Sequence, residues 1–346
     1  MRKINQIPLF SRVVILTAIV MGAVNIQTSR AAEPIDIKVG YIPILAAAPL
    51  FITIAEGWAS EQNLKLNLTK FDSGPVAIQA LASGQIDMMY AGVGPVIVAR
   101  EAGADLSIIG NCAVEELALA ARGELAESWR NRGNKSASDV IADLAKSRGR
   151  PIKIATQPAG SVPDTVLRYW LSKIVKLDEK QVEIVRMGIE ATQQALLAGA
   201  VDAAAIREPT ITVIQDRDPK IAILAAGSAL FPNQPGTVIA VSNNFKKTHK
   251  KELTALLSMQ KRAVALIASD PKKSSQIVQE YLGKGLIEPD QLQRALASPY
   301  SKFSANPYTI LNAVRRMRDF QLEIGVISKL TTKDDGFDFT YYDAAK

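Results

Sequence analysis

The chain has 346 residues and a formal net charge of +7, and it contains one cysteine and one histidine. A single cysteine excludes an intrachain disulfide, so the fold must rest on an apolar core, for which the length is ample. The lone His249 lies in a lysine-rich stretch, which argues against a Ser-His-Asp triad, a Cys-His pair or a histidine metal cluster.

The N-terminal segment, residues 1–31, is predicted to be a cleaved secretory leader. Basic residues precede an apolar run over 13–24, and the small residues Ser29 and Ala31 suit a signal peptidase. The run is short for a spanning helix of about 20 residues, although an uncleaved anchor is the alternative. Losing the leader removes four basic residues and no acid, which lowers the net charge to +3. The composition therefore gives no support for nucleic-acid binding.

Two stretches of the chain recur at a constant offset of 115 residues. Residues 37–43 are echoed at 152–158, and the Gln-Ala-Leu-x-x-Gly-x-[Ile/Val]-Asp motif of 79–87 is echoed at 194–202. The same spacing between an apolar strand and a helix-turn-strand motif predicts two lobes built alike. Clefts between lobes are where small ligands bind, so a ligand-binding cleft is expected.

The first lobe is predicted to alternate strands and helices, which is typical of a parallel α/β sheet. Strands are expected at 37–42, 64–71, 86–90 and 106–111, with helices opening at Pro49 and after Pro75. Leu117 to Ala121 is interpreted as an extended crossing into the second lobe. Asp87 ends the repeated motif, as Asp202 does in the second copy, and both are assigned a structural capping role.

The second lobe repeats this plan, and the strand at 237–242 is expected to return to the first lobe. Helices near 250–268, 271–282, 290–297 and 307–324 are predicted to form a helical C-terminal cover. The resulting domain boundaries are 32–115 for the first part of lobe I, 116–236 for lobe II, 237–332 for the return to lobe I, and 333–346 for a tail without clear periodicity.

Candidate ligand-binding residues follow from the topology. Ligands of open parallel sheets bind outside the carboxyl ends of the strands, where loops lead into helix N-termini with unpaired N–H groups. The predicted contacts are Ile44, Leu45, Ala46, Ser73, Gly74, Tyr90, Gly92, Gly160, Ser161, Arg207 and Glu208. Two other interpretations stay open: the Ser-Gly pairs act only as helix caps, and Arg207 with Glu208 is an ion pair at the rim.

No catalytic residue, metal ligand or cofactor is predicted. The sequence contains no P-loop, and no Gly-x-Gly-x-x-Gly fingerprint follows the first strand. Cys112 is interpreted as a small buried apolar residue.

Several of these motifs resemble those of the substrate-binding proteins of nitrate, sulfonate and taurine importers. The resemblance rests on Pro49-Leu50-Phe51-Ile52 with Ala55-Glu56-Gly57-Trp58, on Phe71-x-Ser73-Gly74, on the motif of 79–87 followed by Gly92, and on Gly160-Ser161 with the second copy of that motif. It covers most of residues 36–270. The broader group includes binding proteins for pyrimidine precursors.

The resemblance implies a type II periplasmic binding fold: two α/β lobes that close by a hinge around one small solute. It also implies a monomer in the periplasm that delivers the solute to an ABC permease and its ATPase. Val162-Pro163-Asp164 replaces the histidine that many sulfonate-type members carry after the Gly-Ser, and Arg207-Glu208-Pro209 replaces an aromatic-Asp-Pro. These departures favour a solute with an amino or ring N–H donor over a simple alkanesulfonate.

The expected function is therefore capture of a small anionic or zwitterionic organic solute, without catalysis. Two alternatives share the fold: binding of a pyrimidine or flavin precursor, and a periplasmic ligand-sensing domain. A pyrimidine-synthase-like enzyme is disfavoured, because that chemistry uses a cysteine-rich segment and an active-site histidine.

Overall fold

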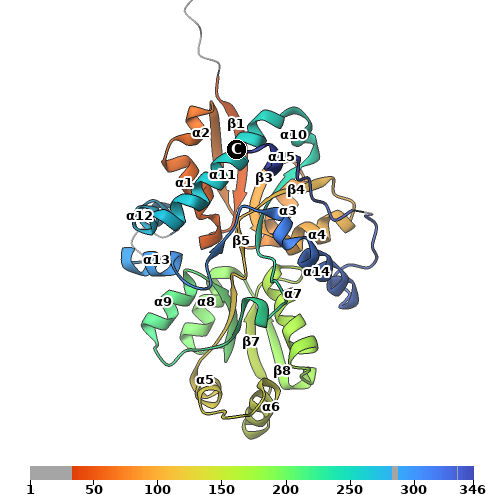
Figure 1. Cartoon of the computed structure of the whole chain (residues 1–346). Helices are drawn as coiled ribbons and strands as arrows, with labels where there is room; N and C mark the ends of the chain where they lie inside the picture. Colours follow the sequence, from red (N-terminus) through yellow and green to blue (C-terminus); the bar gives the residue numbers. More distant parts are fainter. Residues whose placement is uncertain (1–32, 283–286, 333) are drawn as a thin grey trace, which may run out of the picture. The chain divides into compact units, whose positions relative to one another are not determined.

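The computed structural model describes residues 33–282, 287–332 and 334–346. The predicted leader, 1–31, lies outside these residues. Pro34–Lys346 form one compact unit that contains two five-stranded sheets. Figure 1 shows this unit coloured along the sequence from red to blue. Within the described part of the chain, no helix is both long enough and apolar enough to cross a bilayer.

The first sheet has the strand order β2-β1-β3-β11-β4. β1 runs parallel to β2 and β3, whereas β11 is antiparallel to both of its neighbours. The strands are β1 (Ile35–Tyr41), β2 (Leu64–Lys70), β3 (Met88–Gly92), β4 (Leu106–Asn111) and β11 (Thr237–Ser242). Every residue of β3 is buried, because helices cover both faces of the sheet.

The second sheet has the order β10-β6-β9-β7-β8. β7 is parallel to β8 and β9, and β6 is antiparallel to β9 and β10. The strands are β6 (Leu117–Ala121), β7 (Ile152–Thr156), β8 (Val182–Arg186), β9 (Ala203–Arg207) and β10 (Ala222–Ala226). The first sheet receives its antiparallel strand late in the chain, as expected for residues 237–242.

The sequence repeat is also a repeat of strand pairing. Val39 pairs with Met88 in the first sheet, and Ile154 pairs with Ala203 in the second. Both members of the second pair lie 115 positions after their counterparts. The prediction of two similarly built α/β halves is confirmed at the level of individual residue pairs.

The aspartate that ends each repeat has the predicted structural role. The Lys38 amide donates to the Asp87 carboxylate at 2.8 Å, and the Lys153 amide donates to the Asp202 carboxylate at 2.9 Å. The amide of each aspartate donates in turn to the carbonyl of the same lysine. This reciprocal pair of bonds joins the helix-to-strand turn to the neighbouring strand in both sheets.

Helices flank both sheets, and the C-terminal ones contact both halves. Those of the first half are α1 (Ala48–Ala55), α2 (Trp58–Glu61), α3 (Gly74–Ala82) and α4 (Val93–Glu101). Those of the second half are α5 (Gly123–Arg130), α6 (Ala137–Arg148), α7 (Val162–Tyr169), α8 (Ile189–Ala198) and α9 (Thr210–Arg217). The C-terminal helices are α10 (Asn243–Thr248), α11 (Lys250–Ser269), α12 (Pro271–Leu282), α13 (Pro289–Leu296), α14 (Leu311–Glu323) and α15 (Thr340–Ala344). α11 packs on α1, α13 packs on α9, and α14 packs on both α4 and α7.

The crossing out of the first sheet lies earlier in the chain than predicted. Leu117 to Ala121, expected to be the crossing, forms strand β6 and is buried throughout. Five small or apolar residues in succession suit a central strand that is covered on both faces. The crossing is instead Cys112–Glu116, whose short strand β5 (Ala113–Val114) pairs with β12 (Lys302–Phe303).

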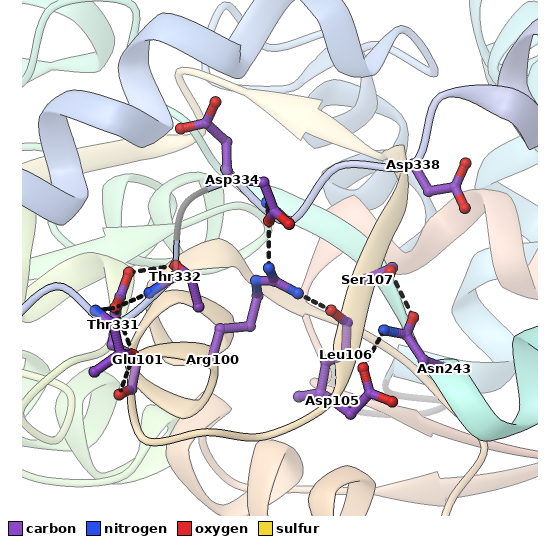
Figure 2. Close-up of polar contacts among 12 residues, drawn as sticks. Arg100, Glu101, Asp105, Leu106, Ser107, Asn243, Thr331, Thr332, Asp334 and Asp338 are labelled. Atoms are coloured by element: carbon purple, nitrogen blue, oxygen red, sulfur yellow. Dashed lines mark hydrogen bonds and ion pairs between the residues drawn. The ribbon is translucent and has the colours of Figure 1, made fainter.

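The tail after residue 332, for which no period was found, packs against the edge strand β4. The Ile108 amide donates to the Gly336 carbonyl at 2.7 Å, and the Asp338 amide donates to the Ile108 carbonyl at 2.9 Å. Figure 2 shows the adjoining contacts, in which Glu101 accepts hydrogen bonds from Thr331 and Thr332. The segment thus continues the first sheet beyond β4 before it turns into α15.

Candidate functional site

A cavity of about 470 Å³ lies where the two halves meet. Pro43, Ile44 and Lys70 line it from the first half, and residues from the ends of β7 and β9 and from α8 and α9 line it from the second. Its polar lining residues are Lys70, Gln157, Glu190, Thr192, Gln193, Gln194, Arg207, Glu208, Thr210, Arg217 and Glu280. A volume of this size is usual for a small-molecule site.

Five of the predicted residues gather at this cavity. Ile44, Arg207 and Glu208 line it directly. Leu45 and Ala46 line a recess of about 10 Å³ that shares Arg207 and Glu208 with the cavity. A hydrogen bond of 3.1 Å from the Leu45 amide to the Glu208 carbonyl joins the two halves at this point.

The other six predicted residues, Ser73, Gly74, Tyr90, Gly92, Gly160 and Ser161, do not line this cavity. They are buried, several of them where loops of the two halves touch. A Cβ at Gly92 would lie 2.9 Å from a methyl of Val162, and one at Gly94 would lie 2.6 Å from the Gly160 carbonyl. These positions require glycine because the two loops approach so closely.

Ser161 is engaged as a helix cap. Its hydroxyl accepts a hydrogen bond of 3.2 Å from the Asp164 amide at the start of α7. Asp164 in turn lies 2.9 Å from Arg186. A ligand contact of Ser161 stays a prediction.

Arg207 is paired with a residue that the sequence did not single out. Its Nε lies 2.8 Å from a carboxylate oxygen of Glu116, and both side chains are about 95% buried. The Thr237 hydroxyl also donates to Glu116, at 2.9 Å. Burial raises the pKa of Glu116, while Arg207 and Thr237 oppose that rise. Glu116 ends the segment that leads from the first sheet to the second, and Thr237 is the first residue of β11, where the chain re-enters the first sheet. Arg207 is therefore anchored where the chain passes between the two sheets.

Arg207 keeps hydrogen-bonding capacity despite this pair. Its Nη2 is buried and has no hydrogen-bond partner among the residues that the structure describes. The same nitrogen lies 3.8 Å from the place where a Cβ would stand on Gly92. A buried guanidinium N–H without a partner costs free energy, which an oxygen atom of a ligand would recover.

Glu208 caps the next helix. Its carboxylate accepts from the Thr212 amide and from the Thr212 hydroxyl, both at 3.0 Å. Burial raises the pKa of Glu208, and the hydrogen bonds from Thr212 and Ser298 partly offset this rise. The interpretation of Arg207 and Glu208 as a mutual ion pair at the rim is wrong, because both are buried and Arg207 pairs with Glu116 instead.

The outer part of the cavity is bridged by an exposed ion pair. Lys70, at the end of β2, lies 2.9 Å from Glu190 in the first turn of α8. Nearby, a Cβ on Gly188 would collide with the Asp72 carboxylate, so the start of α8 lies directly against the first half. An exposed pair of this kind contributes at most about 1 kcal/mol.

Sequence reasoning missed several lining residues, because their role depends on tertiary contacts. Glu116 could have been found from the pairing of β6 with β9, which sets Leu117 opposite Arg207. Gln157 follows β7 directly and lies within the second copy of the repeat, 152–158. Tyr281, Leu282 and Ile287 come from the C-terminal cover, which carries no sequence signal for a ligand.

Cys112, expected to be a buried apolar residue, is fully buried, and burial raises the pKa of its thiol. The described residues contain no group of three or more His, Cys, Asp or Glu side chains that could hold a metal ion.

The model of the NMT1-like family matches residues 30–282 of this sequence. The chain belongs to the NMT1-like family. A Brucella abortus protein named as a binding protein is 26% identical over 255 residues, which cover 72% of this chain and 73% of that protein. A Bacillus subtilis protein assigned as an aliphatic sulfonates-binding protein is 25% identical over 312 residues, with 88% of this chain and 86% of that protein covered.

This NMT1-like chain also matches solved structures. The alkanesulfonate-binding protein SsuA from Xanthomonas axonopodis pv. citri, bound to MOPS, superposes with a TM-score of 0.70 at 22% identity. The match covers 90% of this chain and all of that one. The predicted resemblance and the α/β fold of periplasmic binding proteins are therefore confirmed. The matching proteins are named as binding proteins, which agrees with the expected lack of catalytic activity.

Proposed function

We propose that this chain is the periplasmic solute-binding component of an ABC importer. It captures a small anionic or zwitterionic organic solute by hinge closure and delivers it to a membrane permease powered by an ATPase. In this proposal it works as a monomer, with lobe I formed by 32–115 and 237–332 and lobe II by 116–236. The predicted leader and the family's binding proteins support export to the periplasm.

The observation that carries the proposal is the cavity itself. Both halves contribute its walls, and the lining includes the buried Arg207, whose Nη2 has no hydrogen-bond partner among the described residues. A solute that touches both halves favours the closed arrangement over the open one. Gly92, Gly160 and Ser161 lie where the halves meet. We propose that they, together with Ser73, Gly74 and Tyr90, are exposed to the solute when the lobes separate.

A thermal-shift screen with a cavity-filling variant tests this function. The probes are nitrate, taurine, alkanesulfonates, aminopyrimidines and flavin precursors. A ligand at a hundredfold excess over its Kd stabilises the folded protein by about 2.7 kcal/mol, so a true ligand raises the melting temperature. Thr210→Trp, which adds bulk at the cavity wall, should abolish the shift.

Thr254→Trp is the matched control, because Thr254 is a partly exposed residue of α11 away from the cavity. It should leave the ligand-induced shift unchanged. A solute that stabilises Thr210→Trp as much as the wild type would show that binding occurs elsewhere. The absence of any stabilising solute would contradict the proposed function.

A further inference from the structure

The charges next to Arg207 are not arranged to receive a bare anion, and the other cations of the lining, Lys70 and Arg217, are exposed. Arg207 is the buried cation of the lining, and the Glu116 carboxylate at 2.8 Å already balances its charge. Glu208 lies next to it, 97% buried. With both acids ionised, this inner cluster of Glu116, Arg207 and Glu208 carries a net negative charge, which repels an anion at close range.

Glu208 itself has no cationic partner among the residues that the structure describes. Every donor to its carboxylate is neutral: the Thr212 amide, the Thr212 hydroxyl and the Ser298 hydroxyl. Burial disfavours the ionised form of this carboxylate and the neutral donors only partly offset that effect, so a cationic or N–H group of a ligand would stabilise it. Whether Glu208 is protonated or ionised, the inner cluster carries no net positive charge.

The same cluster offers one free donor and one carboxylate without a cation. The Arg207 Nη2 needs an oxygen or nitrogen acceptor, and Glu208 favours a cationic or N–H group. About half of the other lining residues are apolar, with Ile189, Ile206, Val213 and Tyr281 among them. At about 470 Å³ the cavity has room for roughly fifteen water volumes of ~30 Å³, far more than a four-atom anion fills.

We propose that Glu208 determines specificity, so that the solute is an organic molecule with an ammonium or ring N–H group for Glu208, an acceptor for Arg207 and an apolar body. This inference rests on the proposed function and narrows its solute class: net-neutral zwitterions and polar heterocycles bind, and inorganic or simple organic anions do not.

Matched pairs of probes that differ by one amino group test the proposal. Titration calorimetry compares taurine with ethanesulfonate, and phenylalanine with 3-phenylpropanoate, alongside nitrate, bicarbonate, MOPS and an aminopyrimidine. The wild-type protein should bind its preferred amino-bearing probe at least tenfold more tightly than the amine-free partner. The proposal is also supported if only the aminopyrimidine or MOPS binds and none of the amine-free anions does.

Glu208→Gln should remove the preference for the amino group, while Glu183→Gln, the same change at a half-exposed position of β8, should retain it. Melting curves establish whether each variant is folded. If Glu208→Gln does not fold, the order of probe affinities of the wild-type protein still decides the outcome. Tighter or equal binding of nitrate, bicarbonate or ethanesulfonate by the wild type overturns the inference but leaves solute binding intact. Binding of no probe at all contradicts the proposed function as well.

Discussion

At the residue scale, the two aspartates of the sequence repeat differ in how many hydrogen bonds and ion pairs their carboxylates make. Asp87 accepts from the Lys38 amide alone among the contacts described for its carboxylate, whereas Asp202 also pairs with Arg148 at 2.6 Å and Arg150 at 2.9 Å. Burial opposes ionisation of Asp202, but hydrogen bonds from Arg150, Lys153 and Arg148 outweigh it and hold its pKa below the ordinary value of 3.8.

Asp202→Asn should therefore lower the free energy of unfolding by about 2 kcal/mol at pH 7, and Asp87→Asn by less than about 1 kcal/mol. Because the folded pKa of Asp202 is lowered, its stabilisation is present above about pH 4 and is lost as the pH falls through the folded value. Urea unfolding at pH 7 and pH 3 measures this difference. Equal losses for the two variants at pH 7 would contradict this account.

At the element scale, the C-terminal segment protects an exposed edge of the first sheet. β4 is the last strand in that sheet, and edge strands present unpaired backbone groups that promote association. The bonds between Ile108 and residues 336 and 338 satisfy part of this edge. Glu101 fixes the start of the segment through Thr331 and Thr332, as Figure 2 shows.

Glu101→Ala should loosen this segment, because it removes four hydrogen bonds from Thr331 and Thr332. We expect a loss of about 2 kcal/mol in stability and faster hydrogen exchange of the Asp338 amide. The Thr237 region, which lies inside the sheet, should be unaffected. Glu124→Ala is the control, because the Glu124 side chain is 65% exposed and lies in α5, away from this segment. Identical exchange of Asp338 in both variants would disprove the anchoring role.

The sequence was sufficient to predict most strands and helices, because their periodicity and caps are local. It was not sufficient where tertiary contacts determine the secondary structure. Leu117 to Ala121 reads as a crossing by its length and position, and only pairing with β9 and β10 identifies it as a strand. The tail has no clear period because its first part is held to β4 by backbone hydrogen bonds, and only the short α15 and the residue that follows it, with Tyr341 and Ala345 buried, add a helical apolar face.

At the scale of the whole molecule, the repeat predicted the cleft but not its polar contacts. Ile44, Arg207 and Glu208 follow strand ends, where the topology rule places ligands, and they line the cavity. Glu116, just before β6, pairs with Arg207 at the end of β9, 91 positions later in the chain, and no local sequence pattern predicts such a contact. Loss of this buried ion pair should lower the stability of the fold.

Arg207→Ala leaves Glu116 buried without a cation, so it should destabilise the fold by about 3–5 kcal/mol in addition to weakening solute binding. Glu116→Gln with Arg207→Met removes both charges and should restore much of that stability but not the binding. Thermal unfolding and calorimetry separate the two effects. A stable Arg207→Ala protein that still binds solute would exclude Arg207 from the site.

The most direct test of closure around a solute is the distance between the two halves, measured by spin labels at Val76→Cys in α3 and Ile174→Cys beyond α7. Both positions are nearly half exposed, and the native Cys112 is fully buried, so labelling is selective. A bound solute should convert a broad distance distribution into a single narrow, shorter one in the wild type, and Thr210→Trp should block this change. An unchanged distribution in the presence of a saturating solute would contradict closure of the two halves on their ligand.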